Sequence, residues 1–155
     1  MSDAASRERT LQEAERACLR RGAQLTPLRR QVLALVLDAE APVGAYALLD
    51  RLKASRPGAA PPTVYRALDF LLEHGLIHKV ERLNAYVGCT GSGHGHGHGH
   101  GHPHQFLICR GCGATAEIAD HAVAHAIEAA ARRAGFAVAE ATVEVEGTCA
   151  RCAAA

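Results

Sequence analysis

Two pairs of cysteines near the carboxyl-terminal end constrain the fold of this chain more than any other feature. Each pair has two residues between its members, Cys109 with Cys112 and Cys149 with Cys152. Four thiolates are the tetrahedral ligand set that closes a structural zinc site. The gap between the pairs, residues 113–148, holds 36 residues and exceeds the spacing of a compact zinc ribbon, so a bound ion would tie the end of the chain to the first pair. A thiol–disulfide switch is the alternative interpretation.

Composition and segment patterns indicate a small protein in a reducing compartment. The 155 residues are 48% hydrophobic, which allows one or two domains with their own cores. The polar N-terminal stretch lacks the pattern of a signal peptide, and no apolar run approaches the roughly 18 residues that a membrane span needs. We therefore expect a cytoplasmic protein without a membrane partner. Thiols stay reduced there, so paired cysteines indicate metal before disulfides.

Residues 1–75 have the periodicity of helices. The predicted helices cover residues 9–22, 26–37, 44–55 and 63–75. The second begins at Thr26 and Pro27, an N-cap followed by a first-turn proline. One apolar face of the first helix holds Leu11, Ala14, Cys18 and Leu19. Cys18 is therefore expected to be a core residue.

A β-hairpin follows the helices, and this order is typical of a winged helix-turn-helix. Residues 77–89 predict two strands around a turn centred on Leu83 and Asn84. Residues 1–84 hold 13 Lys and Arg against 10 Asp and Glu, whereas residues 85–155 hold 4 against 6. We interpret the mildly basic first half as a DNA-binding domain. A plain helical interaction domain is the alternative, because a fold does not by itself determine a function.

The second half predicts a smaller unit of mixed structure. Its strands are expected at residues 105–110, 114–119 and 137–149, with an alanine-rich helix at 121–135. A unit of about 50 residues is marginally stable alone, so we expect it to need a metal, a partner chain or both. The expected fold class is α+β. It divides into a winged-helix DNA-binding domain at 1–90, a Gly/His-rich loop at 91–104 and a metal-binding domain at 105–155.

The start of the fourth helix carries side chains suited to reading DNA. Recognition helices contact bases with their N-terminal residues, which here include Thr63, Tyr65 and Arg66. Arg66 could bind a guanine edge with two hydrogen bonds, and Tyr65 could contact a phosphate or a thymine methyl group. The alternative for these two residues is a solvated arginine and a half-buried tyrosine. Tyr46, in the third helix, could likewise reach the DNA backbone. Candidate phosphate contacts, each of which could be an ordinary surface charge, are Arg29, Arg30, Lys53 and Lys79.

His78 and Cys89 predict a second metal site in the hairpin. With the turn centred on Leu83 and Asn84, His78 lies directly opposite Cys89, where Cβ atoms are about 5 Å apart. Glu117 and a histidine from the loop could complete a four-ligand set that links both halves; the alternative is an incidental polar pair. Metal bound at such a site would act as a signal. A coupling of about 1–3 kcal/mol between metal binding and DNA binding changes DNA affinity roughly 5- to 150-fold.

Several stretches together resemble the ferric uptake regulator family. They span the chain from about Leu11 to Cys152 and are QLTPLRR, AYALLD, PPTVYRALDFLLEHGLIHKVE, NAYVGC, LICRGCG and the terminal cysteine pair. The longest of them is most similar to the zinc uptake regulators of that family. The resemblance implies a homodimeric, metal-dependent repressor that binds a double-stranded DNA operator. It also implies that the second half is a small α/β dimerisation domain with a structural zinc, and that each chain holds two zinc ions, one structural and one regulatory.

The resemblance assigns residues to these sites. The structural zinc would be held by Cys109, Cys112, Cys149 and Cys152. The sensing zinc would be held by His78, Cys89, His102 and Glu117. His102 is assigned by its place seven residues before Cys109. The DNA-reading residues would be Tyr65 and Arg66, supported by Tyr46, and positions through which some members pair their dimers on DNA match Asp50 and Lys53.

The histidine run departs from the family pattern. Phe106 stands where a ligating histidine is common, which argues against a third metal site of the usual kind. A different third site could use His104, His121 and His125, and ordinary surface histidines are the alternative. His104 is also the nearest substitute for His102. The remaining histidines of the run fit either a weakly binding antenna or a silent loop, and they are His94, His96, His98 and His100.

These observations favour a zinc-responsive transcriptional repressor of zinc-uptake genes that is not an enzyme. Sulfur at Cys89 with imidazole favours zinc over iron(II). Within the family, the alternative is a sensor of iron, nickel, manganese or peroxide. Outside it, the alternatives are a metal-storage or metallochaperone protein that uses the histidine run, and a zinc hydrolase with three ligands and an open position.

Overall fold

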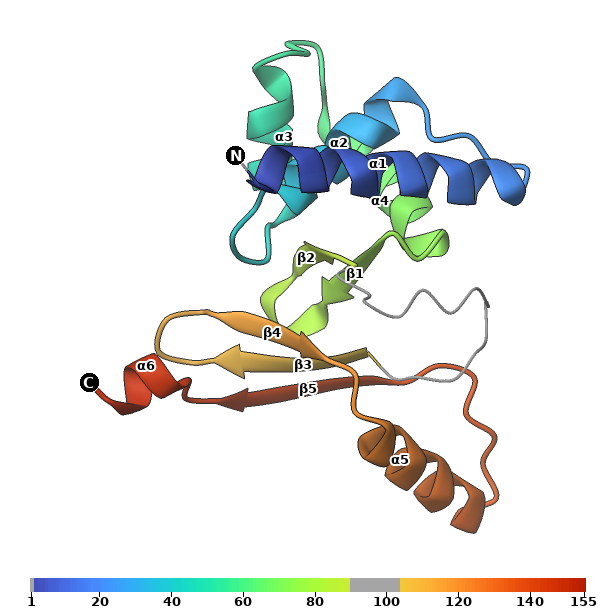
Figure 1. Ribbon diagram of the computed structural model, residues 1–155, viewed down its shortest axis with the longest axis vertical. Helices are drawn as coiled ribbons and strands as arrows, with labels where there is room; N and C mark the ends of the chain where they lie inside the picture. Colours follow the sequence, from blue (N-terminus) through green and yellow to red (C-terminus); the bar gives the residue numbers. More distant parts are fainter. Residues whose placement is uncertain (1, 90–103) are drawn as a thin grey trace. The chain divides into compact units, whose positions relative to one another are not determined.

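The computed structural model describes residues 2–89 and 104–155, and the chain divides into two compact units, Met1–Cys89 and Thr90–Ala155 (Figure 1). Each unit has its own secondary structure and its own hydrogen-bonded sheet. Both combine helices with strands, which confirms the α+β class predicted from the sequence.

The first unit is a winged helix. Its elements in chain order are α1 (Ser2–Arg20), α2 (Pro27–Leu37), α3 (Ala45–Lys53), α4 (Pro61–Glu73), β1 (Ile77–Val80), the 3-10 helix η1 (Glu81–Leu83) and β2 (Ala85–Gly88). The predicted cap of α2 is present, since Thr26 Oγ1 accepts a hydrogen bond from the Arg29 amide at 3.4 Å. After α4, Gly75 has φ +66°, which closes the helix in the conformation that glycine adopts at least cost.

The first helix is longer than the sequence predicted. It begins at Ser2 rather than near residue 9. Two ion pairs hold its added turns on α2 and the loop after it, Arg7 with Asp38 and Glu8 with Arg30, the latter at 2.6 Å. These contacts join residues far apart in sequence, so the pattern of residues 2–8 alone did not indicate them.

The core of the first unit confirms most of the apolar face predicted for the first helix. Leu11, Ala14 and Cys18 of α1 are buried, but Leu19 is 61% exposed, so its assignment to the buried face was wrong. At 100° per residue Leu19 lies about 80° from Leu11 on the helix, beyond the buried stripe. The side chains of this core with 2% exposure or less include Leu11, Val32, Leu33, Leu48, Leu52, Val64, Leu68, Leu71 and Ile77.

The hairpin has a different register from the predicted one. The structure pairs His78 with Val87 and Ile77 with Gly88, so His78 is not directly opposite Cys89. The reason is the 3-10 turn Glu81–Leu83, which Asn84 closes in a left-handed conformation with φ +46°. The shift is two residues, and side chains two apart on a strand point to the same face. Cys89 therefore stays on the face of His78, as its diagonal neighbour.

A third stretch of chain anchors the hairpin to the helices. Val43, in the loop before α3, bridges to Tyr86 of β2 with two backbone hydrogen bonds of 3.0 and 2.8 Å. Tyr86 is 5% exposed. The wing is therefore held by the helical part of its own unit.

The second unit is a three-stranded sheet with a long and a short helix. Its elements are β3 (His104–Cys109), β4 (Thr115–Ile118), α5 (His121–Arg133), β5 (Thr142–Gly147) and α6 (Ala150–Ala153). The strand order is β4-β3-β5, with β4 antiparallel and β5 parallel to β3. Asp120 caps α5, since its carboxylate accepts from the amides of Ala122 and Val123.

The predicted strand at 137–149 is shorter in the structure. β5 covers only Thr142–Gly147, because its ladder with β3 starts at His104 paired with Thr142 and ends at Cys109 paired with Gly147. The chain then turns into α6, a helix that the sequence analysis did not predict.

Burial predicts how two leucines of the first unit differ in their effect on stability. Leu68→Ala removes a side chain with 0% exposure and should lower the free energy of unfolding by about 2–5 kcal/mol. Leu19→Ala, on the exposed side of α1, should stay within about 0.5 kcal/mol. Urea unfolding followed by circular dichroism measures both, and equal losses would contradict the buried face described above.

Candidate functional site

The four paired cysteines form one cluster in the second unit. Their Sγ atoms all lie within 4.8 Å of one another, and those of Cys112 and Cys149 are 3.7 Å apart. Zinc–sulfur bonds of about 2.3 Å in a tetrahedron place the sulfurs about 3.8 Å apart. The spacing therefore fits four thiolates around one ion of the size of zinc.

Parallel pairing of two strands explains why the cluster forms. Cys109 is the last residue of β3, and Cys149 follows β5 by two residues as the N-cap of α6. Because β3 and β5 run in the same direction and end in register, the segments after them emerge at one edge of the sheet. The 36 residues between the two pairs contain β4, α5 and β5.

A glycine inside the first pair lets the cluster close. A Cβ at Gly111 would lie 3.0 Å from the Sγ of Cys152 and 3.3 Å from its Cβ. The second cysteine pair thus packs directly against the backbone of the first. Gly111 was not among the predicted site residues, although its place between Cys109 and Cys112 is a signal that could have indicated it.

Backbone amides and crowded thiols shift the ionisation of the cluster in opposite directions. The amide of Cys149 donates to Cys109 Sγ at 3.3 Å and, with the amides of Cys112 and Gly111, lowers the pKa of Cys109 to about 6. The other thiols, Cys112 first among them, raise the pKa of Cys152 to about 12. The Cys152 amide likewise lowers the pKa of Cys149, so some of the thiolates are stabilised while the ionisation of all four together is opposed. A divalent cation would remove that opposition, since metal ligands bind deprotonated.

Two predicted metal ligands share a face of the hairpin in the first unit. His78, on β1, is 8% exposed. Cys89 follows β2, and its amide donates to the Leu76 carbonyl at 3.2 Å, which continues the β1–β2 ladder by one residue. Diagonal positions on one face of a ladder are within reach of one metal ion for side chains of this length. The structure thus places these two residues on one face of the hairpin, by another register than the predicted one.

Two further candidate ligands meet in the second unit. His104 at the start of β3 and Glu117 of β4 lie on one face of the sheet, with Nδ1 and Oε1 3.6 Å apart. Phe106, directly opposite Glu117, is 1% exposed and occupies that face beside them. His102 and the histidines at 94, 96, 98 and 100 lie outside the described residues.

The remaining candidate histidines are exposed on a helix. His121 is the first residue of α5, and His125 lies one turn later. Within residues 2–89 and 104–155, neither belongs to a cluster of three or more potential metal ligands. The structure therefore does not bring His121 and His125 together with His104 as a third site in the part it describes.

The residues predicted to read DNA lie at the start of α4 and of α3. Tyr65 is 39% exposed and Arg66 is exposed, while Val64 between Thr63 and Tyr65 is buried. Tyr46, on α3, is 66% exposed. Both tyrosines are therefore accessible to a binding partner. Thr63 has a second role, since its Oγ1 accepts a hydrogen bond from the Ala60 amide at 3.4 Å.

The residues matched to dimer pairing on DNA are also on α3. Asp50 and Lys53 are both exposed, on the turns that follow Tyr46.

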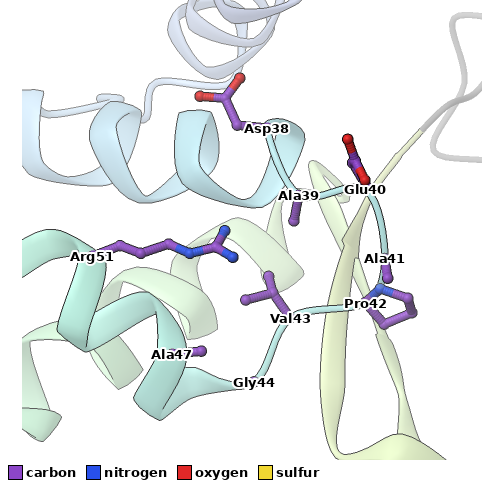
Figure 2. A pocket seen from close by; sticks show the side chains of 9 residues that line it. All are labelled: Asp38, Ala39, Glu40, Ala41, Pro42, Val43, Gly44, Ala47 and Arg51. Atoms are coloured by element: carbon purple, nitrogen blue, oxygen red, sulfur yellow. The ribbon is translucent and has the colours of Figure 1, made fainter. Parts of the chain in front are cut away.

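A shallow cleft of about 610 Å³ lies elsewhere in the first unit. It is lined by the loop from Asp38 to Gly44 and by Ala47 and Arg51 of α3. Figure 2 shows the Arg51 side chain extending from α3 toward the loop residues Ala39 and Val43. Among the described residues that line it, none is a predicted metal ligand or DNA contact. The candidate chemistry of this chain is therefore at the cysteine cluster, the hairpin and the helix starts.

The family model of the ferric uptake regulators matches residues 20–146 of the chain. This chain belongs to the ferric uptake regulator family. A curated member, the zinc uptake regulation protein of Escherichia coli K12, is 41% identical over 142 residues, which are 92% of this chain and 80% of that protein. Within the described residues, the structure has no helix both long and apolar enough to cross a membrane.

Two solved structures of family members are similar to the chain over nearly their whole length. A zinc uptake regulator complexed with zinc and DNA is 40% identical with a TM-score of 0.84, and the match covers 96% of this chain and 95% of that one. The crystal structure of holo XcZur is 46% identical with a TM-score of 0.80, covering 94% and 97%. The winged helix and the small second unit are thus the fold of the family.

The close approach at Gly111 predicts a defect in metal binding. Gly111→Ala should displace Cys152 and weaken binding of a tetrahedral thiolate metal by roughly tenfold, as changes beside metal ligands do. Gly58→Ala is the matched control, because a Cβ at Gly58 meets nothing within 4 Å. Titration of metal-free protein with cobalt(II), read by its thiolate absorption, measures both affinities. Equal affinity in the two variants would contradict the packing described.

Proposed function

We propose that this chain is a zinc-responsive, sequence-specific DNA-binding repressor of zinc-uptake genes, acting as a homodimer in the cytoplasm. The observation that carries the proposal is its similarity, over 96% of its length, to a zinc uptake regulator complexed with zinc and DNA. The site residues add their own support, since they offer ligands suited to zinc and an exposed helix start suited to DNA.

The four-cysteine cluster holds a structural zinc. Four sulfur donors at tetrahedral spacing fill the four coordination positions of zinc and form a closed site, which serves folding rather than catalysis. Because the cluster joins the end of β3 to the segment after β5, the free energy of zinc binding becomes folding free energy of the small second unit.

A second zinc acts as the signal, held by His78, Cys89, His102 and Glu117. His78 and Cys89 share a face of the hairpin, and Glu117 has His104 3.6 Å away as the substitute for His102. Sulfur and imidazole together favour zinc over iron(II). Since these residues belong to both units, zinc binding there would restrict how the units move relative to each other. A coupling of about 1–3 kcal/mol would raise operator affinity roughly 5- to 150-fold.

DNA is read by the start of α4. Arg66 binds a guanine edge, Tyr65 contacts a phosphate or a thymine methyl group, and Thr63 and Tyr46 contact the backbone. Two such helices in a dimer match half-sites about one DNA turn apart or a multiple of it. Repressor bound at a promoter then excludes polymerase.

The homodimer is supported by the open side of the second unit. β5 lies at an edge of the sheet in the described part of the chain, and unpaired strand edges favour pairing with another chain. Leu107 and Val145, neighbours across β3 and β5, are 42% and 48% exposed. Asp50 and Lys53 on the exposed side of α3 would pair dimers on DNA, although lysine lacks the forked geometry of a guanidinium.

No enzymatic activity belongs to this proposal, and metal storage is the second candidate function. The histidine run, with its alternating glycines, is the observation that favours storage. Storage requires several metal ions per chain and no sequence-specific DNA binding.

A selection of genomic DNA fragments at buffered high and low free zinc tests the proposal. We expect the purified protein to retain fragments that share a palindrome, and only at high zinc. Cys89→Ala should remain folded and lose this zinc dependence, because it removes the sulfur of the sensing site. Cys18→Ala, which removes a thiol with 1% exposure from the α1 core, is the matched control. Recovery of no common sequence with zinc, iron, manganese or nickel would favour metal storage.

Substitution of Arg66 can distinguish a contact with a base from a general contribution of its positive charge to DNA binding. Arg66→Ala should weaken operator binding by roughly 1–3 kcal/mol and leave binding to random DNA nearly unchanged. Arg133→Ala, at the end of α5 in the other unit, removes the same charge and should change neither. Fluorescence anisotropy on both DNA sequences gives the values. Equal losses on operator and random DNA would make Arg66 a phosphate contact.

A further inference from the structure

Arg151 reaches from the second cysteine pair to a sulfur of the first. It is an exposed residue of α6, between Cys149 and Cys152, and its Nη2 lies 3.9 Å from the Sγ of Cys112. Cys112 is the exposed member of the cluster, whereas Cys109 is buried and the other two are half-buried. The arginine thus stands beside the sulfur that solvent reaches most easily.

The charge of the cluster explains what an arginine would do there. Four thiolates around a divalent ion leave a net charge of −2, which makes the sulfurs nucleophilic. A guanidinium beside a thiolate offsets part of that charge and donates a charge-assisted hydrogen bond to the sulfur. The effect is local to Cys112, since the Arg151 side chain contacts that sulfur.

We propose that Arg151 protects the four-thiolate zinc site from oxidation by lowering the nucleophilicity of the Cys112 thiolate. The inference rests on the structural zinc of the proposed function. With hydrogen peroxide as oxidant, the Cys112 sulfur attacks one oxygen, the O–O bond breaks, hydroxide leaves and a sulfenic acid forms. The thiolate of Cys149, 3.7 Å away, then attacks that sulfur and displaces a second hydroxide, which forms a disulfide and releases the zinc.

The first cysteine pair supplies a matched control. Arg110 also lies between two clustered cysteines and is exposed. Its backbone amide donates to the Gly147 carbonyl at 2.9 Å, but within residues 104–155 its guanidinium makes no hydrogen bond to a cysteine sulfur. Arg110→Ala therefore removes the same charge from the same region without removing the contact to Cys112.

The test follows zinc release from the full-length, zinc-loaded protein with a chromogenic chelator, at fixed pH, before and after hydrogen peroxide is added. Zinc that the chelator removes without peroxide is subtracted. Arg151→Ala should speed the peroxide-dependent release roughly two- to fivefold, the range that exposed charge pairs supply. Arg151→Lys should fall between that variant and the wild type, and Arg110→Ala should match the wild type.

Each outcome has a separate meaning. Faster release in Arg151→Ala alone supports the protective contact. Equal rates in all variants, or equal acceleration in Arg110→Ala, overturn it. Zinc content separates this failure from that of the proposed function: if wild type and Cys112→Ser hold the same chelator-resistant zinc, the structural zinc itself is refuted.

Discussion

The parallel pairing of β3 with β5 is the constraint on which the second unit depends. Both strands end in register, at Cys109 and Gly147, and this alone brings two cysteine pairs 36 residues apart to one edge of the sheet. A parallel pair needs a crossover connection, and α5 supplies it. Joining distant points of a chain costs entropy that grows slowly with loop length, so the long gap is little more costly than a short one. A metal at that edge offsets this cost and fixes both strands at their ends.

The two proposed zinc sites place the same ion in different energetic roles. All four cysteines lie in one unit, so binding there stabilises that unit whatever the other does. His78 and Cys89 lie in the first unit and Glu117 in the second, so binding there would depend on how the units are arranged. A sensor needs this second kind of site, because a ligand shifts an equilibrium only by the difference of its affinity for the two states. Four thiolates would suit a zinc ion that stays bound permanently, and a mixed ligand set would suit a zinc ion that exchanges with the surroundings.

Local patterns predicted the parts of the fold that local interactions determine. The cap at Thr26, the end of the fourth helix near Gly75 and the buried residues of α1 all follow from residues within one or two turns. The errors arose where an irregular turn or a tertiary contact decides. The hairpin register depends on the 3-10 turn Glu81–Leu83, and the length of β5 depends on where β3 begins. For the metal centre, ligand spacing indicated the four cysteines, but the contacts that the glycine and the arginine make with them depend on how the two pairs pack.

The backbone at the start of α4 bears on how the proposed DNA contacts could be made. Helix starts often bind phosphate through unpaired backbone amides. Here Pro61 and Pro62 have no amide hydrogen, and the amides of Thr63 and Val64 both donate to the Ala60 carbonyl, at 2.9 and 3.4 Å. The Thr63 hydroxyl accepts from the Ala60 amide, yet its own proton stays available to donate to a phosphate. With the backbone of the first turn used in this way, the proposed recognition of DNA would depend on the side chains of Thr63, Tyr65 and Arg66. Sequence selectivity would then reside in side chains that single substitutions can alter without changing the helix.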